Sequence, residues 1–344
     1  MKTCKVLVTG GCGYIGSHTA IDLLKQGFEV VSIDSLERSQ AFVAGRVEEI
    51  SGKPFHQYSF DCRDEAAVRK VFEQHPDISG VIHFAAYKSV GESVEHPLRY
   101  FDNNLNSLIT VLRVAESFHV QHFVFSSSCS VYGNAASLPV TESTPLAEPE
   151  SPYGRTKLMS EQIIHDYSLH SRMRFTVLRY FNPAGAHDSG RLGEIPFGKP
   201  DNLVPVITET AIGKRPALTV YGDDYPTRDG SCLRDYIHVM DIASAHTKAL
   251  QYLLENKQKE KVEIFNLGSG EGITVLEMIH AFEKVSATEL NYLLGDKRPG
   301  DVIAIYADNS KARSLLGWIP VRTTEDIMRS AWAWENRMRE EKIK

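Results

Sequence analysis

The chain has 344 residues, a net charge of −6, 42% hydrophobic residues and 24% charged residues. It is long enough to bury a large core and to form two lobes. The negative charge argues against a nucleic-acid or anionic-membrane partner, and no apolar run approaches the roughly 20 residues of a membrane span. Five scattered cysteines without a C-x-x-C pair indicate free thiols rather than disulfides or a metal site, and no signal-like apolar run is seen, which together predict a cytoplasmic protein.

A glycine-rich turn follows the first apolar run of the chain. Val6–Val8 predicts a buried strand, and the residues after the turn have helical spacing. The turn holds Gly10, Gly13 and Gly16, and Gly11 offers a second, overlapping spacing. A strand, a glycine turn and a helix start are the parts of a dinucleotide site, because the free N–H groups and positive end of the helix favour a pyrophosphate. The pattern is equally that of a plain glycine turn.

An aspartate follows the second predicted strand. Gly27 is expected to end the first helix, and the next strand, 28–33, leads into Asp34, 18 residues beyond Gly16. A carboxylate here can accept hydrogen bonds from both hydroxyls of an adenosine ribose and repels a 2′-phosphate. Within a dinucleotide site Asp34 therefore favours NAD over NADP, although Arg38 nearby points the other way. Outside such a site it is an ordinary turn aspartate.

Strands and helices then alternate through the first half of the chain. Apolar runs predict strands at 55–60, 80–84, 122–125 and 174–180, and helical spacing predicts helices at 43–50, 64–74, 99–118 and 152–170. This alternation is typical of βαβ units and predicts an α/β fold with a Rossmann-type doubly wound parallel sheet. Ser128 lies at the carboxyl end of one of these strands, where such sheets bind ligands.

The regular alternation stops near the middle of the chain. Residues 185–202 are rich in Gly, Pro and Asp and predict a loop that crosses to a second lobe. Helices of that lobe are expected near 204–213, 239–255, 274–286 and 323–342. Thr323 and Asp326 form an approximate capping box for the last of them. We expect two domains, 1–182 binding NAD and 183–344 as a smaller mixed α/β substrate domain, with some segments returning to the first.

Tyr153 and Lys157 form the pair that suggests chemistry. They are four residues apart on a predicted helix, so their side chains share one face. A tyrosine titrates near pH 10, too high for a base at neutral pH, but a lysine ammonium one turn away and a cationic nicotinamide favour the phenolate. Ser128 could hydrogen-bond the same substrate oxygen. Such a pair also occurs by chance on helix surfaces, and only the dinucleotide loop and the strand-end serine make the catalytic interpretation the better one.

With these residues in place, the sequence resembles the extended short-chain dehydrogenase/reductase family, and within it the enzymes that act on nucleotide sugars. The resemblance spans nearly the whole chain. The matching strings are Val8-Thr9-Gly10-Gly11, Gly13-Tyr14-Ile15-Gly16, Val81-Ile82-His83-Phe84-Ala85, Val90-Gly91-Glu92-Ser93, Phe125-Ser126-Ser127-Ser128, Val131-Tyr132-Gly133, Ser151-Pro152-Tyr153-Gly154, Leu178-Arg179-Tyr180-Phe181-Asn182-Pro183, Arg234-Asp235-Tyr236-Ile237-His238 and Phe265-Asn266-Leu267-Gly268.

The resemblance implies two sets of binding residues and no metal. The residues implied to contact NAD are Gly10, Gly13, Tyr14, Ile15, Gly16, Asp34, Ser35, Leu36, Asp61, Cys62, Phe84, Ala85, Lys88, Asn103, Ser128, Tyr153, Lys157 and Phe181. The residues implied to contact a UDP-sugar are Ser128, Tyr153, Asn182, Asn202, Leu203, Thr219, Tyr221, Arg234, Arg298, Asp301 and Ile305. Of these, Arg234 and Arg298 would hold the diphosphate, a role that suits guanidinium groups because each offers paired donors.

The resemblance also implies a reaction: NAD-dependent epimerisation at C4 of a UDP-hexose, with Tyr153 taking the 4-hydroxyl proton directly or through Ser128. Related dehydratases and decarboxylases carry an acid just before Val-Tyr-Gly, where this chain has Cys129 and Ser130. Neither residue is a carboxylic acid, which argues against elimination. A different class of function is a non-catalytic NAD-sensing regulator, which would have no need for Ser128, Tyr153 and Lys157 together.

One position departs from the family pattern. Where a family tyrosine restricts the pocket to UDP-glucose and UDP-galactose, and a cysteine or serine admits N-acetyl sugars, this chain has Ile305. We expect mainly UDP-glucose/UDP-galactose exchange as part of galactose metabolism, with some UDP-N-acetylhexosamine activity; Ile305 is equally explained as a packed residue. The resemblance further suggests a homodimer formed through the helices at 99–118 and 153–170, although an apolar helix face could also pack within one chain.

Overall fold

The computed structural model describes residues 4–298 and 302–343. Its centre is a seven-stranded sheet in the order β11-β6-β5-β4-β1-β2-β3, and every pairing in it is parallel. The strands are β1 (Lys5–Thr9), β2 (Glu29–Ile33), β3 (His56–Tyr58), β4 (Ile78–His83), β5 (His122–Ser128), β6 (Arg174–Tyr180) and β11 (Val262–Leu267). The predicted doubly wound sheet of a Rossmann-type fold is therefore confirmed.

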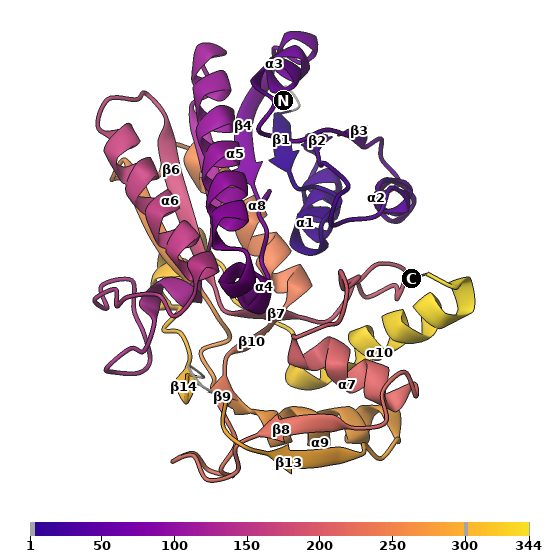
Figure 1. Cartoon of the computed structure of the whole chain (residues 1–344). Coiled ribbons are helices and arrows are strands. Elements are labelled where there is room, and N and C mark those ends of the chain that lie inside the picture. The colour runs from indigo at the N-terminus through magenta and orange to yellow at the C-terminus, as the bar shows by residue number, and fades with distance from the viewer. Residues whose placement is uncertain (1–3, 299–301, 344) are drawn as a thin grey trace.

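Helices cover both faces of this sheet (Figure 1). They are α1 (Tyr14–Lys25), α2 (Phe42–Ser51), α3 (Glu65–Gln74), α4 (Val90–Glu95), α5 (Pro97–Ser117), α6 (Pro152–Ser168) and α8 (Val239–Leu254). Apolar side chains of α1, α2 and α8 form one buried cluster with strand residues such as Val6 and Val8. Side chains of α3, α5 and α6 form a second cluster with Leu7 and Val31. Neighbouring strand residues thus enter opposite cores, as the two-residue period of a strand requires.

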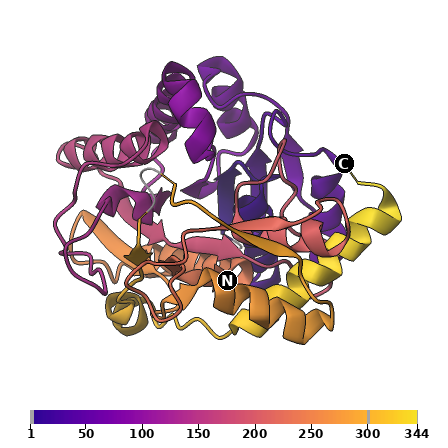
Figure 2. The same ribbon diagram turned by 60° about the horizontal axis from the view of Figure 1, so that its bottom comes forward.

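The remaining elements form a second, smaller region, which lies below the sheet in Figure 1. They are β7 (Asn182–Ala184), α7 (Leu203–Ala211), β8 (Leu218–Tyr221), β9 (Leu233–Arg234), β10 (Tyr236–His238), β12 (Ile273–Thr274), α9 (Val275–Ser286), β13 (Tyr292–Gly295), β14 (Ala304–Ile305) and α10 (Thr324–Glu341). Two further short helical turns are a 3₁₀ helix at Cys129–Tyr132 and a π helix at Ala312–Leu316. In the turned view of Figure 2, α9 and α10 lie side by side, and α7 packs on both.

Several local expectations are confirmed by the termini of the helices. Gly27 follows the end of α1 with a φ of +89°. The helix expected at 152–170 is α6, which Ser151 caps by accepting a hydrogen bond from the Gly154 N–H. Thr323 and Asp326 form the expected capping box of α10. These signals are readable from sequence because they act within one turn of helix.

Three expectations differ from the structure. The strand expected at 55–60 is shortened to β3, because it lies at the sheet edge with one pairing partner only. The helix expected at 239–255 in the second lobe is α8, which packs on α1 and on the sheet instead. The sequence also did not predict β11, which pairs with β6 from Val262↔Phe175 to Leu267↔Tyr180, far apart in the chain. The division into two domains at residues 182 and 183 stays a prediction. Within the described ranges, no helix combines the length and the apolarity needed to cross a membrane.

Candidate active site

The glycine turn between β1 and α1 leaves no room for side chains. Gly10 has a φ of +73°, and a Cβ there would lie 2.9 Å from the Ala85 backbone nitrogen. A Cβ on Gly16 would lie 2.1 Å from the Gly10 carbonyl oxygen. Gly13 stands immediately before α1, whose first turn has no side-chain cap within the described residues. The 10-13-16 spacing therefore matches the tight turn, the ligand approach and the close helix packing of a pyrophosphate site. Gly11 packs against β2 instead.

Asp34 places a buried carboxylate beside this turn. Its Oδ2 accepts from the Cys12 N–H at 3.0 Å, and its Oδ1 accepts from the Leu36 N–H at 2.9 Å and the Ser39 hydroxyl at 2.8 Å. These bonds hold the glycine turn and the loop after β2 together. An anion fixed here suits the hydroxyls of an adenosine ribose and disfavours a 2′-phosphate.

Arg38, which pointed towards NADP in the sequence, is committed elsewhere. Both of its terminal nitrogens donate to the Glu92 carboxylate, at 2.8 and 2.5 Å. Its guanidinium carbon lies 4.6 Å from the ring centre of Tyr87 and 4.3 Å from that of Phe197. A guanidinium that is paired and stacked in this way is not available to bind the 2′-phosphate of NADP. The residues present thus fit NAD.

The other residues expected at the cofactor lie around the same edge of the sheet. Ser35, Leu36, Asp61, Cys62, Phe84, Ala85, Ser128 and Phe181 all follow or end the strands β2 to β6. The Arg63 guanidinium keeps the pKa of the Asp61 carboxyl below its usual range, whereas burial raises the pKa of the Cys62 thiol. Asn103 donates to Asn104, which in turn holds the backbone of Tyr87. Adjacent strand ends therefore bring these residues to one place.

Tyr153 and Lys157 lie on the face of α6 that meets the sheet. Both side chains are buried, at 8% and 4% exposure. The Lys157 Nζ donates to the Ser126 carbonyl at 2.7 Å and lies 5.9 Å from the centre of the Tyr153 ring. Ser128, at the end of β5, uses its hydroxyl to accept from the Ser130 N–H at 3.2 Å. Tyr87 and Tyr100 pack on Tyr153 from the other side.

The protein groups around the pair favour the neutral forms of both side chains. Burial holds the pKa of Tyr153 well above its usual value, the nearby Tyr180 adds to this, and the Ser128 hydroxyl opposes it. Burial also lowers the pKa of Lys157 to about 8, against the raising effect of Glu161. The lysine alone therefore does not produce a phenolate. A further positive charge next to the ring is needed, and a cationic nicotinamide carries one.

A buried ionic network that was not predicted from the sequence lies behind the pair. Glu161 accepts two hydrogen bonds from Arg179, at 3.0 and 2.6 Å, and also one from Ser127. Arg179 continues to Tyr132 at 3.0 Å. The side chains of Glu161 and Arg179 are 7% and 3% exposed. The sequence could have indicated only the position of Glu161, which stands one helical turn beyond Lys157 on the same face, and not its pairing with Arg179.

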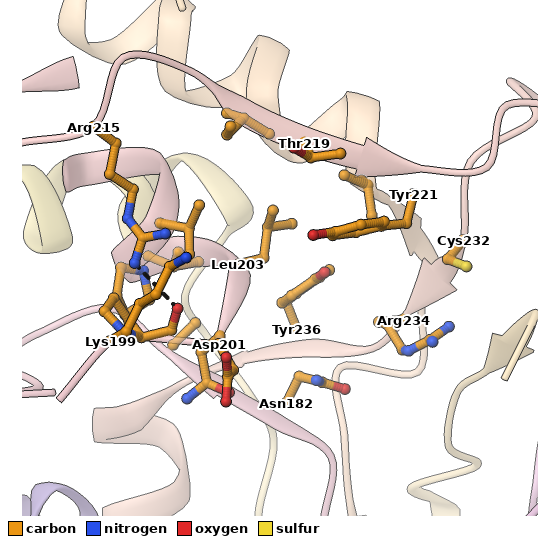
Figure 3. Close-up of a pocket in the computed structure, with 18 of the residues that line it drawn as sticks. Asn182, Lys199, Asp201, Leu203, Arg215, Thr219, Tyr221, Cys232, Arg234 and Tyr236 are labelled. Carbon is orange, nitrogen blue, oxygen red and sulfur yellow. Dashed lines mark hydrogen bonds between the residues drawn. The ribbon is translucent and has the colours of Figure 1, made fainter. Parts of the chain in front are cut away.

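A cavity of about 400 Å³ opens in the second region (Figure 3). Its lining includes seven expected substrate residues, namely Asn182, Asn202, Leu203, Thr219, Tyr221, Arg234 and Arg298. The lining also includes residues that were not predicted from the sequence, namely Lys199, Asp201, Arg215, Cys232 and Tyr236. The Arg298 guanidinium carbon lies 4.6 Å from the centre of the Tyr221 ring. Four cations against one carboxylate make this lining suitable for a diphosphate.

Of the four remaining substrate expectations, the three that lie within the described residues fall outside this cavity. Ser128 and Tyr153 belong to the sheet edge described above. Ile305 is buried and pairs in register with Arg234 through β14 and β9. It belongs to an apolar cluster with Phe181 and Cys129. Ile305 thus contacts both the strand of Arg234, which lines the cavity, and the apolar residues near the catalytic pair. Asp301 lies outside the described residues.

Asp235 organises the loops around Arg234. It is fully buried, and its carboxylate accepts from the Ser269 N–H and hydroxyl at 2.7 and 2.6 Å, from the Gly270 N–H at 3.3 Å and from the Ala307 N–H at 3.0 Å. Three chain segments meet on this one side chain, and this role of Asp235 was not predicted from the sequence. Burial raises the pKa of Asp235, and these hydrogen bonds oppose that shift.

The parallel sheet, the glycine turn and the serine, tyrosine and lysine at its edge define the extended short-chain dehydrogenase/reductase class. Residues 7–331 match the family model described as GDP-mannose 4,6 dehydratase. A UDP-glucose 4-epimerase of Bacillus subtilis is 47% identical over 332 residues, which are 96% of each chain.

Solved structures agree with this comparison. A UDP-glucose-4-epimerase from Stenotrophomonas maltophila with bound NAD and formylated UDP-arabinopyranose is 43% identical, with a TM-score of 0.95 over 98% of this chain and 99% of that one. A UDP-glucose 4-epimerase from Bifidobacterium longum in complex with NAD+ and UDP is 45% identical, with a TM-score of 0.91 over 97% and 98%. The chain belongs to the UDP-glucose 4-epimerase family.

Proposed function

We propose that the protein interconverts UDP-glucose and UDP-galactose by NAD-dependent epimerisation at C4. The observation that carries the proposal is the buried Tyr153–Lys157 pair with Ser128 beside it, at the sheet edge that also bears the glycine turn. Identities of 43–47% to epimerases over nearly the whole chain, two of them solved with NAD, support the same conclusion.

The cofactor would be held by three features of the chain. The first turn of α1, with Tyr14, Ile15 and Gly16, offers backbone N–H groups to the pyrophosphate. Asp34 would accept from the adenosine ribose, and Lys88 and Asn103 would contact the cofactor farther along the same edge. NAD supplies the chemistry that no side chain here can perform, which is to accept a hydride from the sugar C4 and return it.

Proton transfer is the task of the protein. Tyr153, as phenolate, takes the proton of the sugar 4-hydroxyl, either directly or through Ser128, and returns it at the end. Lys157 adds positive charge that favours the phenolate. Arg234 and Arg298 hold the diphosphate, so the 4-keto sugar between the two hydride transfers can turn while the nucleotide stays bound. This rotation allows the hydride to return to the other face.

Elimination chemistry, suggested by the name of the matching family model, lacks its acid here. The positions after Ser128 are Cys129 and Ser130. Burial raises the pKa of the Cys129 thiol to about 12, so it is a poor proton donor. Without an acid at this place, loss of water from the sugar is disfavoured, and the 4-keto sugar is reduced again.

The direct test uses the purified protein without added cofactor. Incubation with UDP-galactose should give UDP-glucose, because the NAD retained on the protein is regenerated in each cycle. Product is measured by chromatography of the nucleotide sugars. A protein that retains NAD and makes no UDP-glucose would contradict the proposal, and formation of a 4-keto-6-deoxy sugar would indicate elimination instead.

We also propose a moderately narrow sugar range. Ile305 is smaller than a tyrosine but buried in an apolar cluster, so the pocket wall is expected to favour UDP-glucose and UDP-galactose over N-acetylated sugars. Assays with UDP-GalNAc and UDP-galactose under the same conditions test this expectation. Equal rates for both would overturn it.

A homodimer is proposed for the quaternary state, and galactose metabolism in the cytoplasm for the biological setting. The proposed interface is the outer face of α5 and α6, where Leu98 and Met159 are 80% and 37% exposed. All five cysteines are free thiols, which is consistent with a reducing compartment. Light scattering during size-exclusion chromatography measures the oligomeric state, and a monomeric mass would refute the dimer.

A further inference from the structure

Glu194 lies where the two binding sites meet. It belongs to the segment that crosses from the sheet to the second region, and its side chain is only 11% exposed. Its Oε1 accepts from the Lys88 Nζ at 2.5 Å and from the Asn202 Nδ2 at 3.1 Å. A single carboxylate oxygen thus receives a cation from one region and an amide from the other.

The position of Glu194 is fixed by the last helix. Its carbonyl oxygen accepts from the Trp334 Nε1 at 2.8 Å. The preceding Gly193 bridges to Ala186, and a Cβ on Gly193 would lie 2.4 Å from the Trp334 ring. The backbone here is therefore held tightly against α10, and it presents the carboxylate from a rigid base.

The two partners of Glu194 serve different ligands in the proposed reaction. Lys88 follows β4, and its Nζ lies 5.8 Å from the ring centre of Tyr14, in the first turn of α1. Asn202 immediately precedes α7 and lines the cavity of the second region. Tyr14 itself donates to the Gly185 carbonyl at 2.6 Å, so the crossing segment contacts the cofactor side at a second point.

We propose that Glu194 is a positioning residue that couples the two sites, by holding Lys88 for the cofactor and Asn202 for the UDP-sugar at the same time. This inference rests on the proposed function. Glu194 does not contact the reacting atoms. Its carboxylate sets the direction of both donor groups, and with the carboxylate removed, each donor loses the acceptor that orders it.

Two variants remove the Glu194 carboxylate to different degrees, Glu194→Gln and Glu194→Ala. In Glu194→Ala we expect about tenfold faster loss of NAD and about tenfold weaker UDP binding, which is the size of one charged hydrogen bond at each site. Glu194→Gln keeps one acceptor oxygen without its charge and should recover part of both losses. Turnover per NAD-loaded site should stay within about twofold of the wild type, because Tyr153 and Lys157 are untouched.

The measurements are the NAD content after dialysis, the Kd for UDP by calorimetry and kcat per bound NAD. Glu49→Gln is the matched control, because Glu49 pairs with Arg191 of the same crossing segment but contacts neither Lys88 nor Asn202. It should leave all three quantities unchanged. The single variants Lys88→Met and Asn202→Ala should each weaken one ligand only.

The outcomes separate the inference from the proposed function. If Glu194→Ala weakens NAD retention and UDP binding together, while each partner variant affects one, the coupling role is supported. A Glu194→Ala protein that changes neither quantity, or only one, overturns it. NAD retention and UDP affinity are measured without turnover, so a wild-type protein that binds both ligands but makes no UDP-glucose refutes the proposed function alone.

Discussion

The cofactor side and the substrate side of this molecule are built in different ways. On the cofactor side, residues come from the ends of adjacent parallel strands and from one face of α6, so each is placed by a regular element. On the substrate side, the cavity is lined from short strands, a helix start and loops spread between Asn182 and Arg298. The first arrangement follows from backbone geometry, and the second depends on single side chains such as Asp235.

This difference predicts which property a substitution in each region changes. A change on the cofactor side should affect the chemical step or the stability of the whole sheet. A change on the substrate side should affect affinity for the UDP-sugar while leaving NAD in place. The four variants and conditions below test that division, in order of decreasing effect.

Removal of the Tyr153 hydroxyl should have the largest effect. Tyr153→Phe is expected to lower kcat by roughly 10³-fold, the usual contribution of a positioned acid–base group. Bound NAD should remain, because the glycine turn and Asp34 are intact. Tyr167→Phe on the same helix should stay within twofold. Unchanged turnover in Tyr153→Phe would refute the catalytic role of Tyr153. An unchanged phenotype with NAD retained would end the enzyme hypothesis and favour an NAD-sensing regulator.

Loss of the buried ion pair should act on stability. Glu161→Gln leaves the Arg179 guanidinium uncompensated, which is expected to cost about 3–5 kcal/mol of unfolding free energy. The same change removes the anion that raises the pKa of Lys157, so the alkaline limit of the pH–rate profile should move to lower pH. Glu148→Gln breaks an exposed pair with Arg155 and should cost less than about 1 kcal/mol. Equal melting temperatures of the two variants would contradict this ranking.

Acid should destabilise the folded chain through its buried histidines. Burial lowers the pKa of His18 to about 4 and that of His238 to about 3, both below the value near 6.5 in an unfolded chain. The folded state therefore binds fewer protons, and the stability present above pH 6.5 is lost as the pH falls. Between pH 7.5 and 6.0 each histidine should remove about 1 kcal/mol. Urea unfolding at both pH values measures this loss of unfolding free energy, and a smaller loss in His238→Asn would assign part of it to His238. Equal unfolding free energies of the wild type at the two pH values would refute the prediction.

The smallest effect is expected on the substrate side. Asp235→Asn places an amide where four donors converge, which should shift the loop that carries Arg234. We expect KM for UDP-galactose to rise about tenfold, at a cost of about 1 kcal/mol in stability, the net contribution of one hydrogen bond. NAD retention should not change. Asp224→Asn, which breaks an exposed pair with Lys297, is the control. A loss of NAD in Asp235→Asn would show that the two sides are not separable.

Much of the cofactor side was predictable because its signals are local. The spacing from Gly10 to Gly16 and the four-residue step from Tyr153 to Lys157 express the geometry of a turn and a helix. The pairing of Arg179 with Glu161 was not predictable in this way, because it joins a strand to a helix. The same holds for α8, whose amphipathic pattern indicated a helix without indicating which core it enters.

By itself, the amino-acid sequence determined the alternating elements, the helix caps and the strand-end residues, because these depend on hydrogen bonds and side-chain periods within a few residues. Only in the folded chain does burial raise the pKa of Tyr153, does Arg38 pair with Glu92, and does Glu194 meet both Lys88 and Asn202. The pKa of Tyr153 depends on desolvation. The pairs Arg38–Glu92 and Lys88–Glu194 each join residues more than 50 positions apart in the chain. No local pattern records such contacts, since they form only when separate segments pack together.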